Sequence, residues 1–394
     1  MPATCNVALI GQKFMGRAHS NAYLKAARFF NLPLVPVTHT IVGRDLIALA
    51  PFAARWGWKK YSTAWKDVLK DPEIDLVDIS TPNNNHAELA LAALAAGKHV
   101  ACEKPLAGTL RDARAMRNAA VKSRRSKTFV WYNYRRCPAV ALAHLLVKAG
   151  RLGRIYHVRA TYLQSWGTPD TPLVWRFQKK YAGSGAHGDL NAHIIDMARF
   201  ITGDEITEVT GAIAETFVPE RDLPGVTAKP TGGARRGKPA RGKVDVDDAV
   251  LFLARFHHGA IASFEASRLA TGNQNNNTIE INGEKGALRF AFEDMNLLWF
   301  YDATQDPQTA GWQRIMCTAG GKHPYAGAWW PDAHIIGYEH TFVNMVADMM
   351  AVLGGEQPVV PLPDFADAYE TQRVLEAALL AAKSRSAVKL SEIK

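Results

Sequence analysis

One short pattern near the start of the chain limits its possible folds more than any other feature. The apolar residues 6–10 lead directly into Gly11–Gly16, which reads GQKFMG, and a helical pattern follows through Phe30. A strand, a glycine turn and a helix in this order are the context of a dinucleotide-binding fingerprint. The first glycine permits the tight turn, and amides at the helix N-terminus can hold a pyrophosphate. Lys13 stands at the middle glycine position, so the fingerprint is incomplete.

Strands and helices continue to alternate after this turn. The pattern predicts strands at residues 37–42, 76–79, 99–102 and 128–132, and helices at residues 46–56, 62–69 (with Ser62 as its candidate cap), 87–96 and 111–121. Such alternation indicates a parallel sheet with right-handed crossovers. Ligands bind these sheets at the carboxyl ends of the strands, where Gly11, Gly43, Thr81 and Lys104 fall.

The pattern changes after Tyr134. A helix at residues 137–149 and a strand at 155–163 are followed by strands at 208–217, 248–256, 260–267, 278–282, 287–292 and 297–301, and by closing helices at 337–353 and 365–383. We therefore expect an α/β Rossmann domain at residues 1–134. An α+β domain at residues 135–394 would carry an open-faced, mostly antiparallel sheet with flanking helices. Its C-terminal helix could pack back on the first domain.

A glycine-rich loop at residues 183–188 runs into a predicted helix that carries Asp189 and His193. Residues four apart on a helix share a face, so a carboxylate and an imidazole are offered together. We attribute the glycines to backbone that passes close to cofactor and substrate. His187, Asp189 and His193 are also suitable metal ligands, but the sequence shows no clear further ligand, and we predict no metal site.

Composition narrows the partners and the compartment. The start of the chain has no signal-like segment, and no apolar run approaches the ~18 residues of a membrane helix. The four cysteines (Cys5, Cys102, Cys137, Cys317) lie far apart, which favours a reducing cytoplasm. The net charge is +10, but six basic residues lie among Gly, Pro and Ala at positions 229–243. This composition is typical of a solvated loop, so we expect neither nucleic-acid nor membrane binding.

The end of the second predicted strand bears on the cofactor. NAD-binding folds usually carry an acid there that accepts hydrogen bonds from the adenosine ribose. Here the residues are Val42, Gly43, Arg44 and Asp45. A glycine removes the repulsion of a 2′-phosphate, and Arg44 could pair with that phosphate, which favours NADP over NAD. In the alternative, Asp45 contacts the ribose from a shifted turn.

The ordered motifs resemble those of the Gfo/Idh/MocA oxidoreductases. They are Gly11–Gly16, Thr81-Pro82-Asn83 with His86, Glu103-Lys104-Pro105, Asp189 with His193, and residues 279–286. Residues 133–136, 162–166 and 175–177 look most like members that oxidise a ring hydroxyl of an anhydrosugar with NAD. The resemblance covers nearly the whole chain and implies a Rossmann domain paired with an open-faced sheet. Lys13 and Gly43 depart from the family pattern.

The resemblance also implies the site. The catalytic group would be Lys104, Asp189 and His193. The cofactor would contact Gly11, Phe14, Met15, Gly16, Gly43, Arg44, Thr81, Pro82, Asn83, His86, Glu103, Lys104 and Arg176. The substrate would contact Lys104, Tyr134, Gln164, Trp166, Arg176, Asp189 and His193. This set suits hydride transfer from a secondary alcohol, which needs a base for the hydroxyl proton and a donor for its oxygen. Either Lys104 or His193 could take that proton.

Three activities remain open at this point. The first is an NAD(P)-dependent oxidation of a ring hydroxyl of a sugar, anhydrosugar, glycoside or polyol to a ketone. The second is a sugar oxidoreductase that keeps its cofactor bound and works in two half-reactions. The third is a cofactor-binding sensor without catalysis. In each case the one-sided sheet predicts an oligomer, because a large apolar sheet face must be covered. The family resemblance implies that this oligomer is a homodimer or homotetramer.

Overall fold

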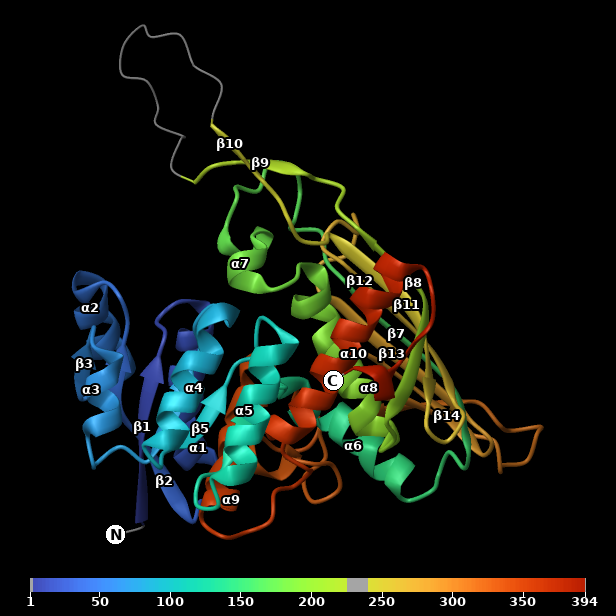
Figure 1. Ribbon diagram of the computed structural model, residues 1–394. Helices are drawn as coiled ribbons and strands as arrows, with labels where there is room; N and C mark the ends of the chain where they lie inside the picture. The colour runs from blue at the N-terminus through green and yellow to red at the C-terminus, as the bar shows by residue number, and fades with distance from the viewer. Residues whose placement is uncertain (1–2, 225–239, 394) are drawn as a thin grey trace, which may run out of the picture.

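The computed structural model describes residues 3–224 and 240–393 and contains two large sheets side by side (Figure 1). The first is a six-stranded parallel sheet in the order β3-β2-β1-β4-β5-β6. Its strands are β1 (Ala3–Ile10), β2 (Leu34–Val42), β3 (Lys60–Ser62), β4 (Leu76–Ile79), β5 (His99–Cys102) and β6 (Thr128–Val130). The intervening helices are α1 (Phe14–Phe29), α2 (Leu46–Trp56), α3 (Trp65–Lys70), α4 (His86–Ala95) and α5 (Leu110–Lys122).

The strand order reverses between β1 and β4, and the glycine turn lies at this switch point. Gly11 has φ +124°, and a Cβ there would lie 2.5 Å from Ser80 Oγ. A Cβ on Gly16 would lie 2.2 Å from the Gly11 carbonyl oxygen. Both positions therefore require glycine, as the fingerprint predicts, and they bring the N-terminus of α1 to the crevice where such sheets bind ligands.

The second sheet has nine strands in the order β16-β15-β14-β13-β7-β12-β11-β8-β17. Neighbouring strands are antiparallel except β7 (Ile155–Leu163) and β12 (Ile261–Ser267), which are parallel. The other strands are β8 (Ile206–Glu215), β11 (Ala249–Phe256), β13 (Asn276–Gly283), β14 (Gly286–Ala291), β15 (Leu297–Asp302), β16 (Trp312–Met316) and β17 (Val388–Lys389). A separate two-stranded ribbon pairs β9 (Glu220–Asp222) with β10 (Arg241–Lys243).

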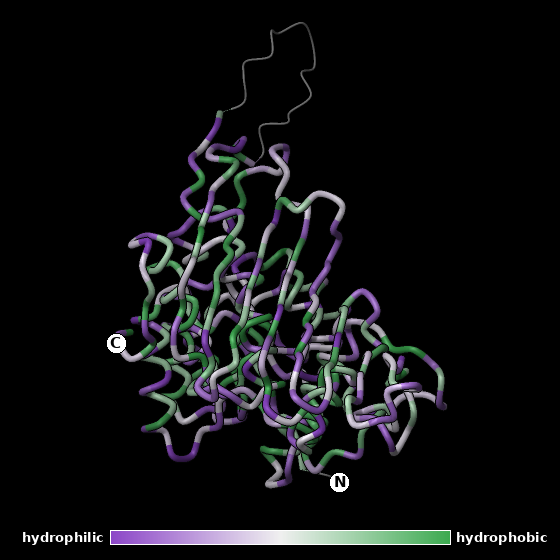
Figure 2. Tube along the Cα trace, turned by 90° about the vertical axis from the view of Figure 1, so that its right-hand side faces the viewer, coloured by the Kyte–Doolittle hydropathy of each residue, from purple (hydrophilic) through white to green (hydrophobic). Residues whose placement is uncertain are grey.

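Helices cover one face of this sheet and leave the other open. The covering helices are α6 (Pro138–Lys148), α8 (Ala192–Thr202) and α10 (Phe365–Ser384), which lie between the sheet and the first domain (Figure 1). Along β11, Phe252 and Ala254 are buried while Leu251 and Leu253 are exposed. Hydrophobic and hydrophilic residues both lie along the long strands (Figure 2).

The two closing helices join the domains. Helix α9 (Tyr338–Leu353) packs against α1, and α10 packs against both α5 and β8. Within the described residues, no helix is long and apolar enough to cross a membrane.

The predicted fold class is confirmed, and the differences are local. The second strand begins at Leu34 instead of residue 37. The helix predicted at residues 62–69 is an edge strand followed by α3, and Ser62 accepts a hydrogen bond from the Ala64 amide without capping that helix. Strands β9, β10, β16 and β17 were not predicted, because short edge strands depend on a tertiary partner more than on local pattern. Residues 229–239 of the basic segment predicted at 229–243 lie outside the described residues.

Candidate active site

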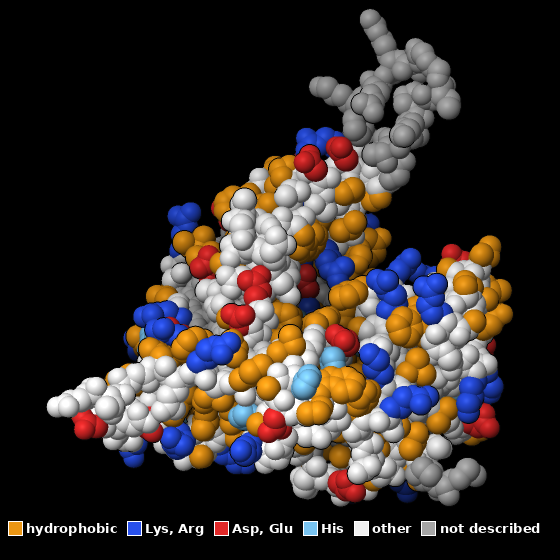
Figure 3. Space-filling model, turned by 180° about the vertical axis from the view of Figure 1, so that it is seen from behind, with side chains coloured by type: hydrophobic (Ala, Val, Ile, Leu, Met, Phe, Trp, Pro, Cys, Tyr) orange, Lys and Arg blue, Asp and Glu red, His pale blue; other side chains and the backbone are white. Residues whose placement is uncertain are grey.

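A cavity of about 760 Å³ opens at the carboxyl ends of the first sheet. From behind, the molecule is hollowed between its two domains, with acidic and basic side chains around the hollow (Figure 3). The predicted cofactor residues on the cavity wall are Gly11, Phe14, Met15, Gly43, Arg44, Thr81, Pro82, Asn83, Glu103, Lys104 and Arg176. Eleven of the thirteen predicted residues therefore surround one cavity.

The residues of this cavity fit a dinucleotide. Helix α1 begins at the cavity, and its N-cap residue Lys13 makes no side-chain cap. The free amides of the first turn and the positive end of the helix dipole favour an anion such as a pyrophosphate. The close approach of Gly11 and Gly16 leaves this helix end open, as the fingerprint requires.

The wall at the end of β2 contains Gly43, Arg44 and Asp45. Arg44 is exposed. Asp45 caps α2, because its Oδ1 accepts hydrogen bonds from the amides of Ile47 (3.0 Å) and Ala48 (3.2 Å). One oxygen of this carboxylate is therefore already committed to the helix.

A second cavity of about 650 Å³ adjoins the first. Both cavities share Phe14, Met15, Glu103, Lys104, Arg176 and Asp189 in their walls. The predicted substrate residues Tyr134, Gln164, Trp166 and His193 also line the second cavity. The shared wall is thus where a bound cofactor and a bound substrate would meet.

An ion pair crosses this shared wall from one domain to the other. Lys104, directly after β5, donates from Nζ to Asp189 Oδ1 (2.9 Å) and to the Asp189 carbonyl oxygen (3.0 Å). The other carboxylate oxygen of Asp189 lies 3.3 Å from Arg268 Nη2 and 3.6 Å from Arg176 Nε. One carboxylate is therefore held by three cations.

These charges set the protonation of the site. Burial would raise the pKa of Asp189, but Lys104, Arg176 and Arg268 outweigh it and hold this pKa well below its usual value. Burial and then the charge of Lys104 lower the pKa of His193 well below 6.5, although Asp189 opposes the change. His193 is neutral at neutral pH, and its Nδ1 has no hydrogen-bond partner among the described residues.

Asp189 sits on a π-helical turn (His187–Asn191) that runs into α8. Such turns are rare in proteins, and those that occur often lie at functional sites. The structure gives no hydrogen bond between Asp189 and His193, and the Asp189 carboxylate binds cations instead. Both side chains nevertheless face the second cavity.

The glycines at 183, 185 and 188 lie close to neighbouring protein atoms. A Cβ on Gly185 would lie 1.7 Å from the Asp247 carbonyl oxygen, and one on Gly183 would lie 2.1 Å from that of Gly108. A Cβ on Gly188 would lie 2.5 Å from Ser184 Oγ. These contacts give the glycines a packing reason, and Gly185 also lines the first cavity.

A chain of polar side chains lines the second cavity. Trp166 Nε1 donates to Gln164 Oε1 (2.7 Å), and Gln164 Nε2 donates to Asn275 Oδ1 (2.7 Å). Asn275 Oδ1 also accepts from the Tyr162 hydroxyl (2.8 Å), which lies 2.7 Å from the Tyr134 hydroxyl. Aromatic faces beside ordered amides and hydroxyls suit a hydroxylated ring.

Two predicted cofactor residues line neither cavity. Gly16 supports the turn from behind. His86 is fully buried, and its ring nitrogens lie within hydrogen-bond distance of the carbonyl oxygens of Thr81 (3.0 Å), Pro105 (3.1 Å) and Leu106 (3.3 Å). This imidazole ties the loop after β4 to the loop after β5 and does not face the cavity.

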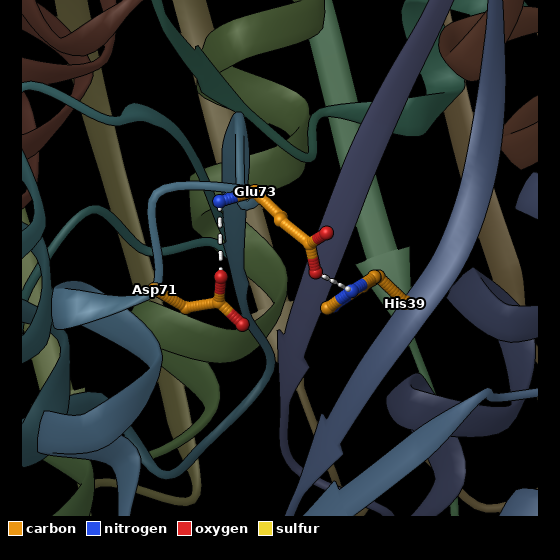
Figure 4. A group of neighbouring side chains, drawn as sticks. All are labelled: His39, Asp71 and Glu73. Carbon is orange, nitrogen blue, oxygen red and sulfur yellow. Dashed lines mark hydrogen bonds and ion pairs between the residues drawn. The ribbon is translucent and has the colours of Figure 1, made fainter.

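His187, Asp189 and His193 are not arranged as the ligands of one metal ion. His187 points away from the cleft, because its Nε2 lies 2.8 Å from the Leu375 carbonyl oxygen and its Nδ1 lies 2.9 Å from Asn191 Nδ2. Among the described residues, His39, Asp71 and Glu73 do come within metal-ligand distance (Figure 4). His39 lies on β2, and Asp71 and Glu73 lie between α3 and β4. Lys60 Nζ already pairs with Glu73 (3.3 Å) and Asp71 (3.6 Å). We therefore treat this cluster as an ion-pair network.

Sequence reasoning missed several residues of the walls, notably Arg268, Asn275 and Tyr338. Arg268 directly follows β12, and Gln164 directly follows β7. Because these strands are parallel, their carboxyl ends meet at one edge of the sheet. Recognition of that single parallel pair would have placed Arg268 at the site.

Comparison with known proteins identifies the lineage. Residues 5–132 match the model of the oxidoreductase family with an NAD-binding Rossmann fold, and residues 140–289 match the GFO/IDH/MocA C-terminal domain. The chain belongs to the Gfo/Idh/MocA family of oxidoreductases. The resemblance noted from the motifs is thereby confirmed.

Full-length relatives place this Gfo/Idh/MocA chain beside sugar dehydrogenases. It is 40% identical to a levoglucosan dehydrogenase of Pseudarthrobacter phenanthrenivorans over 98% of each chain. A solved oxidoreductase domain protein from Kribbella flavida is 48% identical, with a TM-score of 0.91 over 98% of this chain and 99% of that one. A solved levoglucosan dehydrogenase with NADH and levoglucosan is 40% identical, with a TM-score of 0.90 and the same coverage.

Proposed function

We propose that this chain oxidises a secondary ring hydroxyl of a sugar, anhydrosugar, glycoside or polyol to a ketone, with a nicotinamide dinucleotide as hydride acceptor. The carrying observation is the Lys104–Asp189 ion pair on the wall shared by the two cavities, with a neutral His193 in the second. The 40% identity to a levoglucosan dehydrogenase supports a small carbohydrate as substrate.

The residues divide the chemistry as follows. A nicotinamide in the first cavity would supply the hydride acceptor. The Lys104 ammonium has three N–H donors, and the two bonds to Asp189 leave one for a substrate oxygen. That donor would stabilise developing alkoxide charge. His193 would accept the hydroxyl proton, because its imidazole is neutral and Lys104 stays paired with a carboxylate.

The test is a panel of sugars, anhydrosugars including levoglucosan, glycosides and polyols, read by the absorbance of reduced nicotinamide. We expect at least one to be oxidised, and Lys104→Met to lower kcat/KM about 100- to 1,000-fold. The exposed Lys122, changed to Met, serves as the matched control. If no member of the panel reduces either cofactor, the dehydrogenase proposal fails. Nicotinamide released on heat denaturation would favour a tightly bound cofactor and two half-reactions instead.

We propose NAD as the cofactor. The NADH complexes of 40% identical neighbours support it, and the NADP preference expected from Gly43 and Arg44 finds no such support. Initial rates should favour NAD at least about tenfold. Arg44→Ala should change the KM for NAD less than about twofold. Equal rates with NADP, lost on Arg44→Ala, would restore the original expectation.

We also propose that two copies of this chain pair through the open sheet face, as a homodimer or within a homotetramer. Ile213, Leu253 and Ile261 are 63%, 52% and 48% exposed on the adjacent strands β8, β11 and β12. An apolar stripe of this kind is usually covered. Leu253→Lys should shift sedimentation toward monomer, whereas Leu380→Lys, at an exposed leucine on α10, should not. A monomeric wild-type profile at micromolar concentration would contradict the pairing.

A reducing cytoplasmic setting is also part of the proposal. All four cysteines are described, and each is buried with a free thiol. We expect intracellular fractionation to recover the chain with its thiols reduced.

A further inference from the structure

The glycine turn and the end of β2 meet at one point on the wall of the first cavity. A Cβ on Gly43 would lie 2.0 Å from Gln12 Oε1 and 3.0 Å from Gln12 Cδ, and both residues line the cavity. Gly43 is not among the glycines with positive φ. Space, and not backbone conformation, distinguishes a glycine here: the Gln12 amide occupies the position where any side chain at residue 43 would begin.

The Gln12 amide has an unused acceptor. Its Oε1 is buried and has no hydrogen-bond partner in the part of the chain that the structure describes. A buried acceptor left unpaired is costly, so such an atom commonly serves a ligand. Asp45, the acid on the same wall, already uses its Oδ1 to cap α2, whereas Gln12 Oε1 is uncommitted.

We infer that Gln12 takes the place of the acid that dinucleotide-binding folds carry at the end of the second strand, and that Gly43 makes room for it. The inference rests on the proposed function, since the ligand is the adenosine ribose of NAD. The terminal torsion of glutamine is soft, so the amide can turn its acceptor toward a ribose hydroxyl. A neutral amide, unlike a carboxylate, brings no charge repulsion against a 2′-phosphate.

The first test is a cycle of Gln12→Ala, Gly43→Ala and the double variant, with NAD as the probe and calorimetric Kd as the readout. Alanine at 43 should displace the Gln12 amide, which is the flexible end of its side chain. Each single change should weaken NAD binding about fivefold. The double variant should lose about fivefold as well, because the second change removes an interaction that is already broken.

The controls separate this coupling from a general effect of alanine. Gly311→Ala adds a Cβ in open space, and Gln308→Ala removes an exposed amide, so neither should change the Kd. The melting temperature should stay the same in all single variants. Independent losses that multiply to about 25-fold in the double variant would overturn the inference.

The second test rebuilds the acid. Gln12→Gly with Gly43→Asp should bind NAD within about threefold of the wild-type chain and raise the ratio of the NADP Kd to the NAD Kd at least tenfold. Gly43→Asp alone should bind NAD more weakly than this double variant. If Gly43→Asp alone binds as tightly as the double variant, Gln12 does not occupy the site of the acid. Wild-type binding of NAD without any sugar oxidation would remove the proposed function and leave this inference standing.

Discussion

Asp189 shows how a single residue can be predicted while its partners are not. Its carboxylate and its place beside a glycine-rich loop mark it from sequence, but its partners come from β5, the loop at residues 175–177 and the end of β12. Lys104 could be predicted from the sequence because it follows a predicted strand. Arg268 could not, because it reaches Asp189 only through the pairing of β12 with β7, which are far apart in the sequence.

Removal of the Asp189 charge should disable the site. Asp189→Asn leaves Lys104, Arg176 and Arg268 without their shared counter-charge and releases the Lys104 ammonium from its fixed position. We expect kcat/KM to fall about 100-fold, because the Lys104–Asp189 pair orients the groups that bind the substrate oxygen, and orientation and acid–base catalysis contribute rate factors of this size. Steady-state kinetics would measure it, with the exposed Asp170→Asn as control. Full activity in the variant would exclude a role for the pair.

His193 should affect stability on the acid side. Because its pKa in the folded chain lies well below 6.5, the unfolded chain binds a proton more readily as pH falls. The folded chain should therefore lose stability as the pH falls below about 6.5. Urea unfolding between pH 7 and pH 5 should show a smaller loss in His193→Gln than in the wild-type chain. Equal slopes would mean that the imidazole titrates normally.

At the scale of elements, α1 is fastened to the sheet by a buried charge network. His19 Nδ1 lies 2.9 Å from Asp78 Oδ2 on β4, and Nε2 lies 3.1 Å from Glu103 Oε1 after β5. Tyr23 and Trp131 donate to the same Asp78 carboxylate at 2.9 Å. Glu103 also lines both cavities, so this network fixes the helix that carries the glycine turn against the site.

This network predicts a pH-dependent stability of the opposite sign. Burial would lower the pKa of His19, but the carboxylates of Asp78 and Glu103 outweigh it and raise the pKa to about 9. The stabilisation, about 3 kcal/mol, is fully present below the unfolded pKa of about 6.5 and is lost as pH rises through 9. His19→Gln should therefore destabilise the chain most at pH 6, by urea unfolding. A deficit that stays constant up to pH 9.5 would contradict it.

Helices and strands with a strong pattern in their own residues were predicted well. Features that depend on pairing with distant segments were not. Residues 76–79 and 99–102 form strands as expected, because short segments made mostly of apolar residues are typical of strands buried on both faces. The π-helical turn at His187–Asn191 leaves no trace in hydrophobic periodicity. The direction of pairing between β7 and β12 is equally invisible in either strand alone.

At the scale of the whole molecule, a buried cluster binds the domains together. Arg135 follows the last strand of the first sheet, and its guanidinium pairs with Asp196 on α8 and with Asp367 on α10. Arg199 on α8 also pairs with Asp367 at 3.0 Å. The turn Asn133–Arg136, through which the chain leaves the first sheet, is thus linked by ion pairs to two helices that cover the second sheet.

Loss of Arg135 should loosen the whole chain. Arg135→Met leaves Asp196 buried without its main counter-charge, at a cost of about 3 kcal/mol. Burial already raises the pKa of Asp196 to about 6, so protonation should relieve part of this cost at pH 5. Urea unfolding at pH 7 and pH 5 would measure both effects. Arg111→Met, at an 88% exposed side chain, should change stability by less than about 1 kcal/mol.

The single parallel pair in the second sheet also has a consequence for how the chain folds. Strands β7 and β12 are neighbours, yet roughly 100 residues separate them, and that span contains the π-helical turn, α8, β8 and β11. Closing so long a loop costs entropy before any contact compensates for it. The carboxylate of Asp189 meets Arg268 only after this closure, so we expect the two halves of the site to assemble late in folding. A chain arrested before that step would have a second sheet divided between β7 and β12 and no complete active site.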